Sequence, residues 1–315
     1  MLNKPIIINK KEHKYKTILF HPFKKKRIHG GLRLKNNFKR SENLKPLLTI
    51  ITVVKNGAKT LEKCIKSVID QKGVNIEHII IDGSSSDKTI SILKKYSKNI
   101  DYWISEKDNG IYDGMNKGLK LALGEYIGIL NADDFFKKDS LKIIVKYFKR
   151  YKSIDFVFGT VFKEKILSGF WPNKIKWKFN IYSAHSVGFF IRKDSQKILG
   201  LYDNKFRFSA DRDLFYRMIK KYRMKGIATS KKELIGYFSK GGISESLSFF
   251  DRLIEETRIR INNNQNIIIV FLLFFIHLFY QSKKFFKKKN ENSIHSINFF
   301  TNNRWFRNSV SQHGK

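Results

Sequence analysis

The first half of the chain alternates between short apolar runs and segments with helical periodicity. The run Leu47 to Val54 is rich in β-branched residues, which is typical of a strand buried on both faces. Similar short runs predict further strands at His78 to Ile81, Tyr102 to Ser105 and Tyr126 to Leu130. Apolar positions at helical spacing predict helices between them, at Thr60 to Gln71, Ser86 to Tyr96 and Asp113 to Leu123. This alternation predicts an α/β fold with a mostly parallel sheet flanked by helices.

The second half of the chain, from about Ser140 to Phe250, is less regular. Its patterns predict a helix at Leu141 to Tyr151, a strand at Phe156 to Val161 and a helix at Asp211 to Tyr222. The chain contains no internal repeat. One sizeable domain with short flanking segments is therefore expected from 315 residues.

The formal net charge of +36 favours anionic partners, such as nucleic acid, anionic lipid or phosphorylated substrates. Eleven Lys and three Arg against two Glu give residues 1–45 a net charge of +12, and residues 281–315 carry +7. More than half of the excess thus lies in two flanking segments, and residues 1–45 are expected to form a basic, at most partly ordered arm. The single cysteine, Cys64, excludes an intrachain disulfide and fits a reducing cytosol; the N-terminus shows no secretory signal.

Polar clusters follow each of the four predicted strands, whose carboxyl ends meet at one edge of the sheet. They are Lys55 to Gly57, Asp82 to Thr89, Glu106 to Gly118 and Asn131 to Asp134. Taken singly, Asp82 to Ser84 is about equally compatible with an ordinary strand-to-helix turn. Asn109-Gly110 alone is better explained as a turn, and an isolated pair such as Asp133-Asp134 is more often a helix cap than a metal site. As a group, the carboxylates of these clusters repel one another unless a cation compensates them. A divalent ion held by one or two carboxylates and by substrate phosphates is therefore expected.

In order and spacing, these motifs resemble family 2 glycosyltransferases, which have the GT-A fold with a Rossmann-like sheet. The resemblance rests on Thr49 to Asn56, Asp82 to Thr89, Gly110 to Gly118 and Leu130 to Asp134. It continues more weakly through His185-Ser186, Ala210 to Leu214 and Gly241 to Ser244. It implies a catalytic domain over residues 46–250, in which residues 46–135 bind the nucleotide-sugar and residues 136–250 bind the acceptor.

The resemblance also implies roles for individual residues. Asp211 matches the proposed general base, and Asp133 would bind the divalent cofactor, Mn²⁺ or Mg²⁺. Asn131 replaces the first aspartate of the family's Asp-X-Asp motif, so it offers a hydrogen bond to ribose but no charge. Asp82 would bind the nucleotide base, with uracil as the expected base. For His185, a histidine buried in the core is about as compatible with the sequence as one near the donor. The implied donor-binding residues are Val54, Asn56, Asp82, Gly110, Asp113, Asn116, Lys117, Asn131, Asp134 and His185.

The expected function is therefore inverting transfer of a sugar from a nucleotide-sugar, a UDP-sugar, to a saccharide acceptor in cell-surface polysaccharide biosynthesis. Two alternatives come from other classes: a metal-dependent nucleotidyltransferase and a basic nucleic-acid-binding protein. The first usually has a Gly-rich loop with basic residues near the first strand, which Val54 to Gly57 offers only weakly. The second predicts basic and aromatic residues on the working face, whereas the strand ends are acidic.

The segment Ile267 to Tyr280 is apolar apart from His277 and is followed by Lys283, Lys284 and Lys287 to Lys289. As a helix it would span about 21 Å, short of the roughly 30 Å hydrocarbon core of a bilayer. A buried core helix is one interpretation, and an interfacial or re-entrant segment is the other. We expect residues 251–315 to associate with an anionic membrane surface. The enzyme is then expected to be cytoplasmic and peripheral at the inner face of the cell membrane, with a lipid-linked acceptor.

Overall fold

A computed structural model describes residues 13–22, 27–42, 45–239 and 248–280. The Gly241 to Ser244 motif and the basic residues after position 280 lie outside the described residues. The chain divides into two compact units, Met1–Ile259 and Arg260–Lys315. The expected boundary at residue 250 falls inside the helix α7 (Phe249–Asn262), most of which belongs to the first unit.

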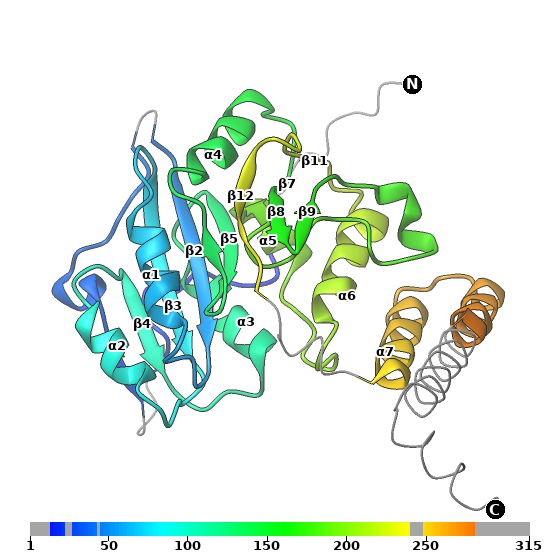
Figure 1. Ribbon diagram of the computed structural model, residues 1–315, viewed down its shortest axis with the longest axis horizontal. Helices are drawn as coiled ribbons and strands as arrows, with labels where there is room; N and C mark the ends of the chain where they lie inside the picture. The colour runs from blue at the N-terminus through cyan, green and yellow to red at the C-terminus, as the bar shows by residue number, and fades with distance from the viewer. Residues whose placement is uncertain (1–12, 23–26, 43–44, 240–247, 281–315) are drawn as a thin grey trace, which may run out of the picture. The chain divides into compact units, whose positions relative to one another are not determined.

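The first unit is built on an eight-stranded sheet with the strand order β1-β4-β3-β2-β5-β10-β7-β11 (Figure 1). Strands β2, β3, β4 and β5 are mutually parallel, whereas β1 and β10 run antiparallel to their neighbours. The mostly parallel sheet expected from the sequence is therefore confirmed. Its strands are β1 (Ile28–Gly30), β2 (Leu47–Val54), β3 (Asn75–Asp82), β4 (Tyr102–Ser105), β5 (Tyr126–Asn131), β7 (Phe156–Phe158), β10 (Phe189–Arg192) and β11 (Gly226–Ala228).

Helices cover both faces of this sheet, as the continuously apolar strands require. Alternate residues of β2 enter different hydrophobic clusters, with Ile51 and Val53 on one side and Leu48 and Ile50 on the other. The first cluster includes residues of α3, α5 and α6, and the second includes residues of α1 and α4. The helices are α1 (Leu61–Ile69), α2 (Thr89–Lys95), α3 (Ile111–Leu121), α4 (Leu141–Arg150), α5 (Lys193–Leu199) and α6 (Ala210–Tyr216).

The less regular second half differs from the sequence prediction in two places. The single strand expected over 156–161 is divided at Gly159 into β7 and β8, which belong to different sheets. A Cβ atom at Gly159 would lie 2.5 Å from Ile235, so the chain passes too close to its neighbour for a larger residue. The helix expected to reach Tyr222 instead ends as a π-helical turn at Arg217–Lys221. The second sheet contains β6 (Phe135–Phe136), β12 (Leu234–Tyr237), β8 (Thr160–Lys163) and β9 (Lys165–Leu167), in that order.

The described part of residues 1–45 is integrated into the fold and is not a loose arm. Strand β1 pairs with β4 at the edge of the sheet, and the short helix Leu32–Lys35 follows it. Arg33 in this helix is buried and its guanidinium lies 2.7 Å from Glu77 of β3. Thr49 donates to the same carboxylate at 2.6 Å. A buried charge needs such partners, and the sequence pattern gave no sign of them.

The C-terminal segment is helical over residues 267–280. Val270 and Leu273 are buried, whereas Ile268, Phe271 and Phe275 are 73%, 58% and 60% exposed. The exposed residues recur at helical spacing, so they form one apolar face. Within the described ranges, no helix combines the length and the apolarity needed to cross a bilayer.

Candidate active site

The loops that follow β2 and β3 bind each other at the carboxyl edge of the sheet. Asn56 has a left-handed backbone, with φ of 52°, and its side-chain oxygen accepts from the Ser86 amide at 2.9 Å. Asp82, at the end of β3, is fully buried and accepts from the Ser85 amide at 3.0 Å and from the Ser105 hydroxyl at 2.6 Å. The Val54 carbonyl accepts from Gly83 at 2.9 Å. Three of the expected donor-binding residues, Val54, Asn56 and Asp82, therefore lie at adjoining strand ends.

Helix α3 begins after Gly110, whose φ of 112° is readily adopted only by glycine. Asp113, in the first turn, accepts from the Asn109 amide at 3.1 Å. One turn later, the Lys117 ammonium lies 2.8 Å from the buried Glu106 and 3.5 Å from Asp113. The charge of Lys117 is therefore already compensated within the protein.

The family resemblance implies that Asn116 binds the donor, but in the structure its side chain bonds to the backbone of Tyr202. Its amide group donates to the Tyr202 carbonyl and accepts from the Tyr202 amide, both at 2.9 Å. Asn116 is buried and does not line the pocket described below. In this structure it connects α3 to the segment that precedes α6.

The loop after β5 carries the Asn131 to Asp134 motif and is held by two serines from distant segments. Asp134 is buried and accepts from the Ser186 hydroxyl and, at 2.7 Å, from the Ser239 amide. Ser186 also accepts from the Asn131 amide at 2.8 Å. Burial, followed by the charge of Asp133, raises the pKa of Asp134 to about 7. Asp134 therefore supports the loop and does not itself line the pocket.

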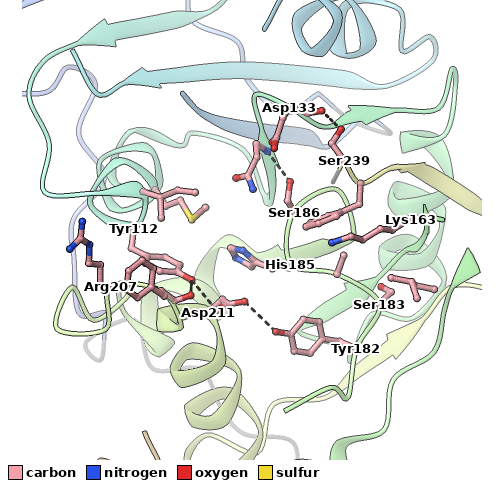
Figure 2. A pocket seen from close by; sticks show the side chains of 17 residues that line it. Tyr112, Asp133, Lys163, Tyr182, Ser183, His185, Ser186, Arg207, Asp211 and Ser239 are labelled. Atoms are coloured by element: carbon pink, nitrogen blue, oxygen red, sulfur yellow. Dashed lines mark hydrogen bonds between the residues drawn. The ribbon is translucent and has the colours of Figure 1, made fainter. Parts of the chain in front are cut away.

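A pocket of about 260 Å³ lies where β5, α3, the second sheet and α6 converge (Figure 2). It brings together four of the residues expected from the sequence, namely Asn131, Asp133, His185 and Asp211. Figure 2 shows Asp133 on one side and Asp211 on the other, with His185 between them. The Asn131 side-chain oxygen is buried and has no hydrogen-bond partner in the described structure, so it is available to a ligand donor.

Asp211 lies at the start of α6, and both of its carboxylate oxygens accept hydrogen bonds from tyrosines. Tyr112 of α3 donates at 2.9 Å and Tyr182 donates at 3.2 Å (Figure 2). Burial, reinforced by the charge of Asp211, raises the pKa of each tyrosine well above its ordinary value. Both hydroxyls therefore stay protonated and fix the orientation of the carboxylate. The residue preceding α6 is Ser209, so Asp211 is not the N-terminal cap of this helix.

His185 is buried and its Nε2 atom lies 2.7 Å from the Tyr202 hydroxyl. Burial lowers the pKa of His185, with a smaller opposing effect from Asp211, so the ring is neutral. The sequence is compatible with a histidine buried in the core and with one near the donor. In the structure the ring is buried and also lines the pocket.

Lys163 and Arg207 place two cations in the pocket lining, and they lie on different sides of it in Figure 2. The Lys163 ammonium lies 4.5 Å from the centroid of the Phe238 ring. Its charge also acts on Asp133, whose pKa is raised mainly by burial. The Arg207 guanidinium lies 5.3 Å from the Phe208 ring and forms no ion pair among the described residues. The pocket lining therefore combines these two cations with the two carboxylates of Asp133 and Asp211.

The donor atoms around Asp133 fit an open metal site. Asp133 supplies one carboxylate at the pocket, whereas the neighbouring carboxylate of Asp134 is held by Ser186 and Ser239. Within the part of the chain that is described, no three His, Cys, Asp or Glu side chains cluster closely enough to hold an ion by themselves. Mg²⁺ or Mn²⁺ would thus have to complete its shell with water and ligand phosphates, as Mg²⁺ commonly does.

Sequence reasoning missed Tyr112, Tyr182, Lys163 and Arg207 as pocket residues. Tyr112 stands inside the quoted Gly110 to Gly118 motif, so the motif itself was a usable signal. Nothing in their local sequence distinguishes the other three, because the fold alone brings them to the pocket.

Comparisons with known proteins agree with this architecture. Residues 49–218 match the family model described as glycosyl transferase family 2. A "PGL/p-HBAD biosynthesis glycosyltransferase" of Mycobacterium bovis is 27% identical over 229 residues, which cover 69% of this chain and 87% of the relative.

Two solved structures share the fold at low sequence identity. Staphylococcus aureus TarS 1–349 in complex with UDP has a TM-score of 0.54 and 15% identity, covering 68% of this chain and 64% of that one. The mannosyltransferase PcManGT from Pyrobaculum calidifontis, in complex with GDP-Man and Mn²⁺, has a TM-score of 0.55 and 16% identity, covering 70% and 65%. This chain thus spans slightly less than two thirds of the length of each of these structures.

Proposed function

Because this chain belongs to glycosyltransferase family 2, we propose that it transfers a sugar, with inversion, from a UDP-sugar to a saccharide acceptor in polysaccharide or glycolipid biosynthesis. The observation that carries the proposal is the arrangement of the pocket. Asp133 and Asn131 stand at the carboxyl end of the parallel sheet, and Asp211 faces them across the pocket. In this arrangement the donor phosphates would bind beside Asp133, and the acceptor would bind on the opposite side of the pocket, beside the base Asp211.

The acceptor hydroxyl would lie against Asp211. The oxygen of the acceptor hydroxyl forms a bond to the anomeric carbon, while the proton of that hydroxyl passes to an Asp211 carboxylate oxygen. The bond from the anomeric carbon to the diphosphate oxygen breaks, and its electron pair leaves on the nucleotide diphosphate. One displacement of this kind inverts the anomeric centre. Tyr112 and Tyr182 keep the carboxylate oriented throughout, because their protonated hydroxyls hold both of its oxygens.

Negative charge develops on the departing diphosphate, so positive charge near it lowers the barrier. Lys163, whose charge already acts on Asp133, supplies part of this compensation. Asp133 would hold a divalent ion, with Asn131 hydrogen-bonding the ribose. Such an ion, when bound, supplies additional stabilisation of the leaving-group charge. Asp82 and Asn56, at the neighbouring strand ends, would bind the uracil base.

The family assignment argues against the two rival classes, a nucleotidyltransferase and a nucleic-acid-binding protein. The acidic residues at the centre of the site also disfavour nucleic acid as the ligand, since a phosphate backbone is bound by basic surfaces. The direct test is thermal shift against a panel of nucleotide-sugars with manganese, because a ligand that binds the folded state raises its stability. A UDP-sugar should raise the melting temperature and release UDP on turnover. Retention of nucleic acid in moderate salt, with no response to any nucleotide-sugar, would refute the proposal.

The acceptor is proposed to be lipid-linked and the enzyme peripheral at the inner face of the cell membrane. The support comes from the helical residues 267–280, whose exposed apolar face includes Phe271 and Phe275, and from the lysines that follow in the sequence. Deleting residues 266–315 removes this segment and leaves α7, which ends at Asn262, intact. The shortened protein should leave the membrane fraction while retaining donor binding. A deletion variant that is insoluble would show that the segment belongs to the folded core.

A further inference from the structure

A loop at the edge of the catalytic pocket presents exposed aromatic and basic residues. This tryptophan loop, residues 171–181, is closed at its base by a hydrogen bond of 2.8 Å from the Trp171 amide to the Ile181 carbonyl. Tyr182, the next residue, lines the pocket and donates to Asp211. Leu167, at the end of β9 just before the loop, also lines the pocket. Both ends of the tryptophan loop therefore join the pocket wall, and Figure 1 shows this green segment after β9 extending from the sheet.

One side of the tryptophan loop is buried in the hydrophobic core, and its other side is exposed. Ile175 and Phe179 are buried in the cluster that also contains residues of α6. The intervening helix, Pro172–Lys176, is of the 3₁₀ type, in which residues three apart lie on one side. Trp171, Lys174 and Trp177 follow this spacing, and the tryptophans are 47% and 51% exposed. The Lys174 ammonium lies 5.5 Å from the centroid of the Trp171 ring.

The charge of the tryptophan loop indicates its partner. It contains three lysines, Lys174, Lys176 and Lys178, all exposed, and no acidic residue. Tryptophan favours the headgroup level of a bilayer, where its apolar ring and polar N–H are both accommodated. Lysines beside it attract anionic headgroups while their methylene chains cover apolar surface. A saccharide would use the tryptophan faces but would leave the lysines without a role.

We propose that the tryptophan loop docks onto an anionic lipid surface, as a membrane contact of the catalytic unit itself. The tryptophan loop belongs to the unit Met1–Ile259, whereas the helical residues 267–280 belong to the other unit. Docking brings the pocket edge to the bilayer surface. If the proposed lipid-linked acceptor is correct, this contact presents its sugar to Asp211 without extraction of the lipid from the membrane.

Tryptophan fluorescence tests the contact directly in the full chain. Trp305, outside the described residues, is replaced by Phe to remove its signal, and Trp103 is buried. Vesicles of phosphatidylcholine and phosphatidylglycerol with brominated acyl chains should quench the remaining emission. Vesicles of phosphatidylcholine alone, with the same brominated chains, should not. Adding Trp171→Phe and Trp177→Phe should abolish the quenching. Unquenched emission from protein that sediments with the anionic vesicles would overturn the proposal.

Charge variants supply a matched control. Lys174→Glu with Lys176→Glu should weaken partition onto the anionic vesicles by at least about 25-fold, since each lysine near such a surface contributes about fivefold. Lys142→Glu with Lys146→Glu, exposed positions on α4, changes the net charge equally. This control should weaken partition by less than about threefold, because salt screens charges far from the surface. Equal losses in the two variants would overturn the proposal.

A last measurement separates lipid docking from saccharide binding. Without vesicles, Trp171→Ala with Trp177→Ala should release UDP from the UDP-sugar at the wild-type rate, both with water and with soluble oligosaccharides as acceptors. A comparable loss without lipid would show that the tryptophans bind saccharide, and would overturn lipid docking. Absence of UDP release from the wild-type protein itself would refute the proposed function and leave the quenching result standing.

Discussion

Replacing Asp211 by Asn tests the assignment of the base with little disturbance of the fold. The two side chains have nearly the same shape, so the change removes proton affinity and charge but not volume. The surrounding hydrogen bonds can also adjust. The Tyr112 hydroxyl already lies 3.0 Å from the Phe208 carbonyl, so it can donate there and accept from the new amide group. Tyr182 can continue to donate to the remaining oxygen.

The expected magnitudes follow from this arrangement. No buried polar group need lose its partner, so the free energy of unfolding should change by no more than about 1 kcal/mol. A positioned general base contributes about a hundredfold or more to the rate. Turnover should therefore fall at least a hundredfold, which corresponds to roughly 2.7 kcal/mol in the barrier. Donor affinity should stay near that of the wild type, because the two tyrosines hold Asp211 on the side of the pocket away from Asp133.

The assay compares UDP release and donor binding on one preparation of each protein. Asp213→Asn is the matched control, since Asp213 lies on the same helix, is paired with Arg217 at 2.8 Å and does not line the pocket. The control should retain near-wild-type turnover. Full activity with Asn at position 211 would refute the assignment. Asp133 would then remain as the other carboxylate among the described residues that line the pocket.

Three further predictions concern the metal, the response to pH and the buried ion pair of Arg33 with Glu77. Asp133→Asn should abolish transfer and weaken UDP binding in manganese without lowering stability, because burial already disfavours this charge; unchanged turnover would contradict the metal assignment. Burial lowers the pKa of His78 to about 3, whereas the unfolded chain protonates near 6.5. Stability in urea should thus fall by about 1.4 kcal/mol per pH unit as the pH drops below 6.5, and His78→Gln should flatten that slope; an unchanged slope would exclude this cause. Glu77→Gln leaves the buried Arg33 without its counter-charge and should cost about 3–5 kcal/mol in the free energy of unfolding; a loss below about 1 kcal/mol would mean that the pair is unimportant.

Local patterns in the sequence determined the first half of the domain. The strands β2 and β4 begin and end where the apolar runs do, at Leu47–Val54 and Tyr102–Ser105. Strands buried on both faces leave a continuous apolar signal, and helices between them leave a 3.6-residue period, so each element is encoded within its own residues. The strand-end motifs were equally local, and the family match at residues 49–218 bears out the glycosyltransferase resemblance that they suggested.

The second half followed contacts that no local pattern encodes. Strand β10 lies between β5 and β7 and is antiparallel to both. The apolar run over residues 156–161 is divided at Gly159 into two strands that belong to different sheets. β1 could not be foreseen either, because a three-residue edge strand has no period to detect. In each case the deciding interaction is the pairing with a distant strand, which depends on the whole fold.

The site shows the same division. The sequence by itself determined which polar residues follow the strands, including Asp82 and Asp133, and the family resemblance added the candidate base Asp211. Only the tertiary structure decided their surroundings, because Tyr112, Tyr182 and Asp211 come from three separate segments and meet through hydrogen bonds across the pocket. It also directed Asn116 to the Tyr202 backbone instead of the pocket. A residue type limits the chemistry that is possible at a position, but burial and partners select among the possibilities, and both are properties of the folded chain.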